Sequence, residues 1–246
     1  MMQKKWFESW FDSPYYHVLY QNRNDEEAEF FIDNICAHLR IPIEANLLDV
    51  ACGKGRHAIY LNKKGYRVTG IDLSPASIAA AQLFKNDRLQ FDVHDIREVF
   101  RPAEFDIALN LFTSFGYFDT YDEHVNALKA LSQSLKPNGL LILDYLNTEK
   151  AIQSLNRKEV KQLDGIDFHI SREIVSDRIV KHIHFQDQAH EYTFQERVKA
   201  FTYADFEDLF TRSGFKIMEC FGDYSLNQFD PKTANRLIFI CQKTYA

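Results

Sequence analysis

Acidic and amide side chains stand near the ends of four short apolar runs in the first part of the chain. These side chains are Asp49, Asp72, Asp95 and Asn110. An open α/β sheet binds its ligand outside the carboxyl ends of its strands, so side chains in these positions would face one shared site. Their oxygens could hold a nucleotide-like cofactor through its hydroxyl and amine groups.

A glycine loop follows the first of these runs. The stretch LLDVACGKGRH, residues 47–57, places Gly53 and Gly55 shortly after Asp49. Glycine lets the backbone approach a ligand without a Cβ atom in the way, and the helix expected next offers unpaired N–H groups at its start. Asp72 lies 17 residues after Gly55, close to the place of the ribose-binding acid in a Rossmann-type fold. Taken alone, the loop could also be an ordinary strand-to-helix turn, with Asp72 as a helix cap.

A nicotinamide dinucleotide is the main alternative ligand, because residues 53–58 satisfy the loose pattern G-x-G-x-x-A. Against it, Asp49 precedes the first glycine by four residues, where a dinucleotide site needs room for a pyrophosphate. Tyr60 and Lys64 have a reductase-like spacing, but they lie on the helix directly after the loop, too early to face a nicotinamide. A phosphate-binding P-loop is excluded because the pattern GxxxxGK[ST] is absent.

The elements that must position these residues alternate between short strands and helices. Apolar residues at helical spacing predict an amphipathic helix over residues 25–39. Strands are expected at 46–50, 66–71, 89–93, 105–111 and 140–145, and helices at 56–64, from Ser74-Pro75 onward, and at 121–135. Strands without polar alternation are typical of parallel sheets covered on both faces. The pattern therefore predicts an α/β fold with a doubly wound, mostly parallel sheet.

The second half of the chain changes its period. Residues 159–200 favour two-residue alternation with Ser176-Asp177 as a hairpin turn, which predicts an antiparallel β insert of three or more strands with one apolar face. A helix at 203–212 and closing strands at 215–221 and 237–242 follow. We expect three parts: an N-terminal helical cap with the cofactor-binding α/β core over 1–158, the insert over 159–200 as a lid or dimer surface, and a C-terminal helix with the closing core strands over 201–246.

Composition and charge argue against several classes of function. The chain has 35 acidic and 29 basic residues and a net charge of −6. It therefore lacks the excess of positive charge that is typical of proteins that bind nucleic acid. No run approaches the roughly 20 apolar residues of a membrane span, and the four cysteines stand far apart without a CxxC pair, as in cytosolic proteins. We therefore expect a cytoplasmic protein. His182 and His184 share one face of a strand, but a partly exposed strand face explains them better than a metal, and we expect no metal site.

Five ordered segments together resemble the class I S-adenosylmethionine-dependent methyltransferases. The segments are LLDVACGKGRH, VTGIDLS, DVHDI, FDIALNLFTSFGYF and LKPNGLLILDYLN. The resemblance covers roughly residues 25–150, with a weaker match in the final two strands, and Ala51 stands where the family's loop often has its first glycine. It implies a Rossmann-like methyltransferase fold with S-adenosyl-L-methionine as cofactor and S-adenosyl-L-homocysteine as product.

The resemblance also assigns parts of the cofactor to the strand ends. It implies that Asp49 helps hold the methionine end, that Asp72 binds both ribose hydroxyls, and that Asp95 and Ile96 contact the adenine. The carbonyls of residues 110–111 would line the methionine side. The cofactor-binding residues expected are Tyr16, Asp49, Ala51, Gly53, Gly55, Asp72, Leu73, Asp95, Ile96, Asn110 and Leu111. Carboxylates suit this cofactor, because it carries a sulfonium and an ammonium but no phosphate.

Aromatic residues supply the candidates for the acceptor site. N-terminal tyrosines of resembling enzymes often fold over the cofactor, and the segment FTSFGYF, residues 112–118, follows the fourth strand at the mouth of the expected site. The substrate-binding candidates are Tyr15, Phe115, Tyr117, Tyr145 and Asn147. We assign no catalytic residue, because methyl transfer from an activated sulfonium needs mainly proximity and alignment.

We expect a methyltransferase that acts on a small-molecule acceptor by in-line methyl transfer. Nucleic acid and membranes are not expected as partners, and the insert could serve as a homodimer surface. Two alternatives stay open on the sequence alone: an NAD(P)-dependent oxidoreductase, and a non-catalytic S-adenosylmethionine-binding protein.

Overall fold

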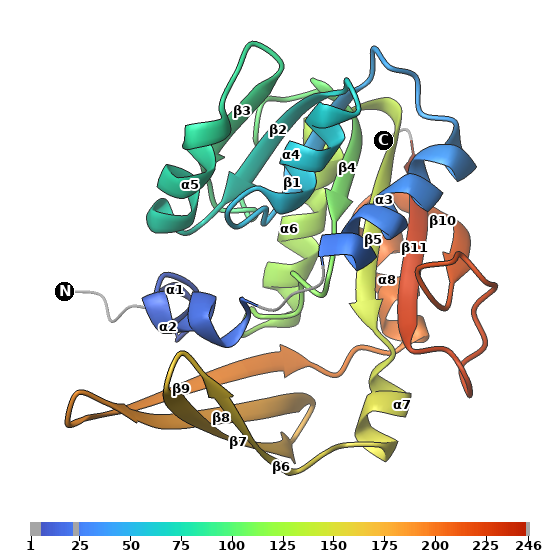
Figure 1. Ribbon diagram of the computed structural model, residues 1–246. Coiled ribbons are helices and arrows are strands. Elements are labelled where there is room, and N and C mark those ends of the chain that lie inside the picture. The colour runs from blue at the N-terminus through green and yellow to red at the C-terminus, as the bar shows by residue number, and fades with distance from the viewer. Residues whose placement is uncertain (1–5, 22–24, 245–246) are drawn as a thin grey trace.

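The computed structural model contains two β-sheets, and helices cover both faces of one of them (Figure 1). The structure describes residues 6–21 and 25–244. The larger sheet has seven strands in the order β10-β11-β5-β4-β1-β2-β3, and the smaller sheet has four in the order β6-β7-β8-β9. Within the described part of the chain, no helix is both long and apolar enough to cross a membrane.

The larger sheet is mostly parallel, as expected. Neighbours among β1 to β5 pair in parallel, whereas β11 pairs antiparallel with both β5 and β10. The strands are β1 (Asn46–Val50), β2 (Arg67–Asp72), β3 (Leu89–Val93), β4 (Phe105–Asn110), β5 (Leu135–Leu146), β10 (Phe215–Phe221) and β11 (Arg236–Lys243). Successive residues of one strand face opposite sides: Leu47 belongs to one apolar cluster and Leu48 to the other.

Helices cover both faces of this sheet. The helices are α3 (Asp25–Leu39), α4 (Arg56–Lys63) and α5 (Pro75–Ala81) on one face, and α6 (Tyr121–Ser134) and α8 (Tyr203–Arg212) on the other. Local signals set their ends: the Ser74 side chain caps α5 with Pro75 in its first turn, and capping boxes open α6 and α8. The short helices η1 (Gln82–Phe84) and α7 (Thr148–Gln153) complete the connections.

One boundary differs from the sequence expectation. The helix over 121–135 was expected to stop at the turn 137–139 before a new strand at 140, yet β5 already begins at Leu135. The pairing with β4 jumps from Phe105 opposite Leu135 to Ile107 opposite Leu140, and Asn138 has a φ of +62°. Residues 137–139 therefore form an irregularity inside a longer strand, because β5 pairs with β4 both before and after them.

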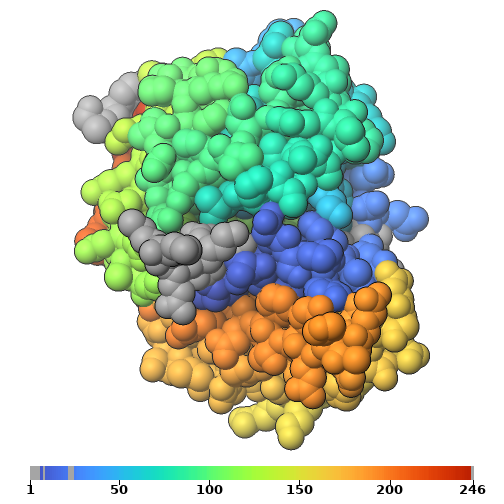
Figure 2. All heavy atoms as spheres, turned by 90° about the vertical axis from the view of Figure 1, so that its left-hand side faces the viewer, coloured from blue at the N-terminus to red at the C-terminus, as the bar shows by residue number. Residues whose placement is uncertain are grey.

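The insert is the antiparallel sheet that the alternation predicts. Its strands are β6 (Lys158–Leu163), β7 (Ile166–Val175), β8 (Arg178–Asp187) and β9 (His190–Lys199). Its apolar face is covered by two short N-terminal helices, α1 (Trp6–Phe11) and α2 (Pro14–Leu19). Figure 1 places both helices between the insert and the larger sheet, and in Figure 2 the blue N-terminal residues form a band between the green core and the orange insert.

Candidate functional site

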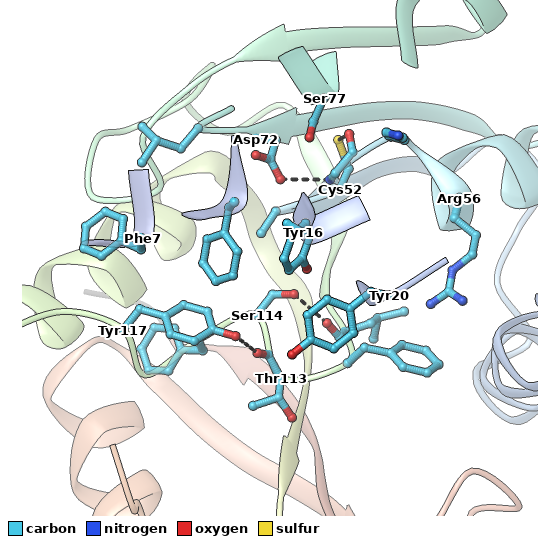
Figure 3. Close-up of a pocket in the computed structure, with 18 of the residues that line it drawn as sticks. Phe7, Tyr16, Tyr20, Cys52, Arg56, Asp72, Ser77, Thr113, Ser114 and Tyr117 are labelled. Atoms are coloured by element: carbon cyan, nitrogen blue, oxygen red, sulfur yellow. Dashed lines mark hydrogen bonds between the residues drawn. The ribbon is translucent and has the colours of Figure 1, made fainter. Parts of the chain in front are cut away.

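The carboxyl ends of the central strands open on a cavity of about 400 Å³. The ends of β1 to β4 and the loops that follow them supply residues 51–54, 72–73, 94–96 and 111–118, and Arg56, His57 and Ser77 come from the first turns of α4 and α5. Gly55, which was expected to bind the cofactor, does not line the cavity. The remaining wall consists of side chains from α1, α2 and the start of α3. In Figure 3, Tyr16 lies between Asp72 and Ser114, so the N-terminal helices face the strand ends across the cavity.

The loop after β1 takes a left-handed backbone at three positions, and the two glycines among them leave room for different neighbours. Ala51, Gly53 and Gly55 have φ values of +57°, +56° and +83°, a region that glycine enters without cost. Gly53 lines the cavity, and a Cβ built on it would meet nothing within 4 Å. A Cβ on Gly55 would sit 2.6 Å from the ring of Phe91. Gly53 thus leaves room for a ligand, whereas Gly55 leaves room for the core beneath.

Asp72 joins the end of β2 to this loop. The Gly53 N–H donates to its Oδ2 atom and the Ser74 N–H donates to its Oδ1 atom, both at 2.8 Å. Burial raises the pKa of Asp72, although these backbone donors act against the rise. Asp72 and Leu73 both line the cavity. Each carboxylate oxygen has a further lone pair, so the residue can accept from a ligand hydroxyl while it holds the loop.

Asp49 lies beneath the cavity and not on its surface. Its side chain is only 1% exposed, and its Oδ2 atom accepts from the Ala58 N–H at 3.1 Å, at the start of α4. Its Oδ1 atom is 3.9 Å from Nδ1 of His57, which does line the cavity. Burial raises the pKa of Asp49 to about 7, because desolvation disfavours the charged form.

Asp95 and Ile96 line the cavity after β3. The Arg97 guanidinium donates to Asp95, with Nη2 to Oδ2 at 2.6 Å, and Nη1 of the same Arg97 donates to Glu123 at 2.9 Å. Partial burial alone would raise the pKa of Asp95, but the hydrogen bonds from Arg97 hold it below its usual value. This carboxylate is therefore ionised and fixed in direction before any ligand arrives.

Asn110, at the end of β4, keeps an acceptor atom unused. Its Nδ2 group donates to the carbonyls of Val50 and Ser114 at 3.2 and 3.4 Å. Its buried Oδ1 atom has no hydrogen-bond partner among the described residues. An unsatisfied buried acceptor costs free energy that a donor from a ligand would recover. Asn110 itself does not line the cavity, whereas the next residue, Leu111, does.

The loop after β4 has a constrained backbone at the cavity. Phe112 and Thr113 both have left-handed φ values, +56° and +61°, which are costly for residues with a Cβ atom. The Phe112 N–H donates to Oδ2 of buried Asp144 at 2.7 Å. Arg236 donates to the other oxygen of Asp144 at 2.7 Å and to the Thr113 hydroxyl at 2.9 Å. A buried ion pair thus fixes this part of the wall.

This set of groups fits S-adenosylmethionine better than a phosphate ester. Asp25, Asp72 and Asp95 line the cavity, and they match the sulfonium and ammonium charges of that cofactor. The basic Arg56 in the lining can pair with the carboxylate of the methionine part. We expect the acids to repel a pyrophosphate.

The substrate candidates divide between the cavity and its surroundings. Phe115 and Tyr117 line the cavity, as does Tyr16, which was expected to bind the cofactor. Tyr15 does not: its ring packs on strands β8 and β9 of the insert, and its hydroxyl donates to Asp187 at 2.9 Å. Neighbouring residues of α2 therefore serve different surfaces, because a helix turns by about 100° per residue.

Tyr145 and Asn147 also lie outside the lining. Tyr145 is fully buried, and its hydroxyl donates to the Lys199 carbonyl at 2.5 Å. The Asn147 amide donates to the carbonyls of Pro231 and Ala234 at 3.0 and 2.9 Å. Both side chains tie β5 to later parts of the chain.

Sequence reasoning did not single out several lining residues. Those on the N-terminal helices and on α4 are Phe7, Phe11, His17, Tyr20, Gln21, Arg56 and His57. One signal was present: Ser13 caps α2 and Pro14 opens it, the same pair of residue types that predicted α5 at Ser74-Pro75. Among the described residues, no group of three or more His, Cys, Asp or Glu side chains could hold a metal ion.

Comparisons with known proteins find methyltransferases. Residues 48–143 match a family model described as a methyltransferase domain. The chain is 24% identical over 83% of its length, and 86% of the relative, to a putative methyltransferase of Bacillus subtilis (strain 168). It is 27% identical over 91% of its length, and 79% of the relative, to a glycine/sarcosine N-methyltransferase of Parasynechococcus marenigrum (strain WH8102).

Solved structures share the fold. A S-adenosylmethionine-dependent methyltransferase from Clostridium acetobutylicum superposes with a TM-score of 0.79 at 21% identity, over 94% of this chain and 96% of that one. An amino pentose methyltransferase from Micromonospora echinaspora with bound S-adenosylmethionine gives a TM-score of 0.69 at 21% identity, over 94% and 98%. The oxidoreductase alternative is set aside, because fold, family model and relatives agree. The methyltransferase-domain model, the relatives and the solved structures together support a class I S-adenosylmethionine-dependent methyltransferase with S-adenosylmethionine as its cofactor.

Proposed function

We propose that this enzyme transfers the methyl group of S-adenosylmethionine to a small-molecule acceptor. The observation that carries the proposal is the wall formed by α1 and α2. Their side chains line the side of the cavity that faces the strand ends, and the cavity has a volume of about 400 Å³. A cavity of this size, with aromatic walls and a few polar groups, suits a compact organic ligand beside the cofactor.

The cofactor supplies the reactive sulfonium methyl group, and the chain supplies binding, orientation and exclusion of water. Asp72 and Asp95 offer fixed carboxylates at the strand ends. Tyr16, Phe115 and Tyr117 offer apolar surface with polar edges around the remaining space. Such walls can hold an acceptor in line with the sulfonium methyl group and exclude water. Proximity and alignment are the protein's contribution to the rate enhancement.

Several relatives support a small acceptor. Similar proteins include the glycine/sarcosine N-methyltransferase named above and a sugar N-methyltransferase from Streptoalloteichus, whose structure gives a TM-score of 0.71 at 21% identity. The two printed names describe N-methylation of glycine or sarcosine and of a sugar. The net charge of −6 also argues against a nucleic-acid substrate, which would need several phosphate contacts. Cytoplasmic location and a homodimer through the insert stay predictions.

An acceptor screen tests the proposal. The enzyme is incubated with S-adenosylmethionine carrying a deuterated methyl group and with amino sugars, small amino acids, phenols, tRNA or duplex DNA. Mass spectrometry then locates the label. We expect label in one of the small molecules and none in nucleic acid, with Asp72→Asn as the low-affinity control. Label found in tRNA or DNA, with salt-sensitive binding, would overturn the proposal.

A further inference from the structure

The insert contributes no described residue to the cavity lining, although it stands next to the cavity wall. The wall itself comes from α1 and α2, through side chains such as Phe7, Tyr16 and Tyr20. On their other side, the same helices pack on the apolar face of the insert, where Trp10 and Leu19 join its buried cluster. Any influence of the insert on the cavity must therefore pass through these two helices.

One carboxylate of the insert receives polar contacts from both helices. Trp10 of α1 donates its indole N–H to Oε1 of Glu196 at 2.8 Å. The hydroxyl of Tyr20, the residue directly after α2, donates to the same oxygen at 2.6 Å. The Glu196 side chain is only 18% exposed. Hydrogen bonds to a charged, largely buried acceptor are the stronger kind.

Lys181 balances the charge of this carboxylate. It lies directly opposite Glu196 in the pairing of β8 with β9, and its Nζ atom is 3.4 Å from Oε2. The same ammonium group contacts the Tyr20 hydroxyl and lies 4.6 Å from the centre of the Tyr20 ring. Lys181 and Glu196 thus neutralise each other within the insert, and both contact Tyr20. This pairing offsets the cost of burying the two charges.

Tyr20 connects this contact to the site. Its hydroxyl binds Glu196, while its side chain also lines the cavity. In Figure 3 Tyr20 lies near Thr113 and Ser114, across the cavity from Asp72. A shift of α2 away from the insert would therefore move a side chain that borders the cofactor site.

We propose that Glu196 is a positioning residue of this methyltransferase. Its carboxylate docks α1 and α2 on the insert, and these docked helices complete the cavity that binds the cofactor. The insert thus acts on cofactor binding without touching the cofactor. This inference does not depend on the identity of the acceptor, since cofactor affinity alone can test it.

The first measurement is the affinity for S-adenosylhomocysteine by calorimetry, for Glu196→Ala, Glu196→Gln and the control Glu191→Ala. Glu191 is an exposed acid on the same strand. We expect Glu196→Ala to weaken binding roughly 10- to 100-fold, because two charge-assisted hydrogen bonds to the helices are lost. Glu196→Gln keeps one acceptor oxygen and should recover part of this loss, and Glu191→Ala should bind as the parent protein does.

The second measurement follows the helices themselves. The chain has two tryptophans, Trp6 and Trp10, both on α1, and Trp10 is fully buried. In a Trp6→Phe background, acrylamide quenching reports the exposure of Trp10 alone. We expect Glu196→Ala to raise the quenching constant severalfold while the circular dichroism spectrum of the core is kept. Simple global destabilisation would change both the quenching constant and the circular dichroism spectrum.

Two results would overturn the proposal. One is an unchanged quenching constant together with a lost affinity, and the other is an exposed Trp10 with unchanged affinity. If Glu196→Ala does not fold, the same two measurements are made on Glu196→Gln and on the control Glu191→Gln. Equal affinity and equal quenching in these two variants would refute a positioning role for Glu196. None of these results bears on the acceptor, so the proposed function stands or falls separately.

Discussion

The buried carboxyl group of Asp49 should make the folded protein less stable as the pH rises. Its pKa is about 7 in the folded protein, against about 3.9 in an unfolded chain. Between these values the folded protein holds a proton that the unfolded chain releases, so stability is lost as the pH rises through about 7. At about 1.36 kcal/mol for each pH unit, the ionised carboxylate costs up to roughly 4 kcal/mol at pH 8.

Asp49→Asn removes this cost, because an amide does not ionise and its oxygen can still accept from the Ala58 N–H. We expect the variant to be more stable than the parent protein, by a margin that widens by roughly 2–3 kcal/mol between pH 5 and pH 8. Urea unfolding at both pH values measures it, with the exposed Asp87→Asn as the control that should follow the parent protein. Other titrating groups cancel in the difference between variant and parent.

The same substitution should weaken cofactor binding. S-adenosylmethionine carries a sulfonium and an ammonium, and a bound cation nearby favours the ionised form of Asp49. Calorimetry at pH 8 should therefore show lower affinity in the more stable variant. A stability margin that is equal at pH 5 and pH 8 would refute the reasoning, because it would mean that Asp49 titrates alike in the folded and unfolded chain.

Two further expectations concern the cavity wall. The resemblance predicts that Asp72 accepts from both ribose hydroxyls of the cofactor. Asp72→Asn would leave one acceptor oxygen for them, so calorimetry should show roughly 10- to 100-fold weaker S-adenosylmethionine binding; unchanged affinity in a folded variant would remove Asp72 from the site. Arg236→Met leaves Asp144 buried without its partner and should lower the free energy of unfolding in urea by about 3–5 kcal/mol. Adding Asp144→Asn should recover part of this loss, and a double variant as unstable as the two single changes summed would contradict a direct interaction.

The sequence predicted the larger sheet well, because the signals for its elements are local. The helix at Ser74-Pro75 is one example, since its cap and its first-turn proline are adjacent in the chain. The alternation after residue 159 likewise predicted an antiparallel sheet with one apolar face. Both kinds of pattern depend on residues a few positions apart, which a single sequence displays directly.

The cavity wall was harder to predict, because distant contacts decide it. Each of the helices α1 and α2 has six residues, too few for a helical period to stand out. The direction of Tyr15 toward the insert and of Tyr16 toward the cavity depends on how α2 docks. That docking depends on pairs such as Tyr15 with Asp187, which are 172 residues apart, and nothing in the local sequence marks them as neighbours.

This separation has a consequence for how the enzyme is made. The loops that line the cavity after β1 to β4 all lie within the first 118 residues, so these segments emerge early during synthesis. The docking site for α1 is completed only by β9, and contacts of such high sequence separation carry the largest loop-closure cost and form late. Until β9 has been translated, Trp10 of α1 lacks its hydrogen-bond acceptor Glu196 and the ring of Phe194 on which it packs. A nascent chain that ends before residue 190 would therefore leave the large Trp10 ring without partners that bury it in the finished fold.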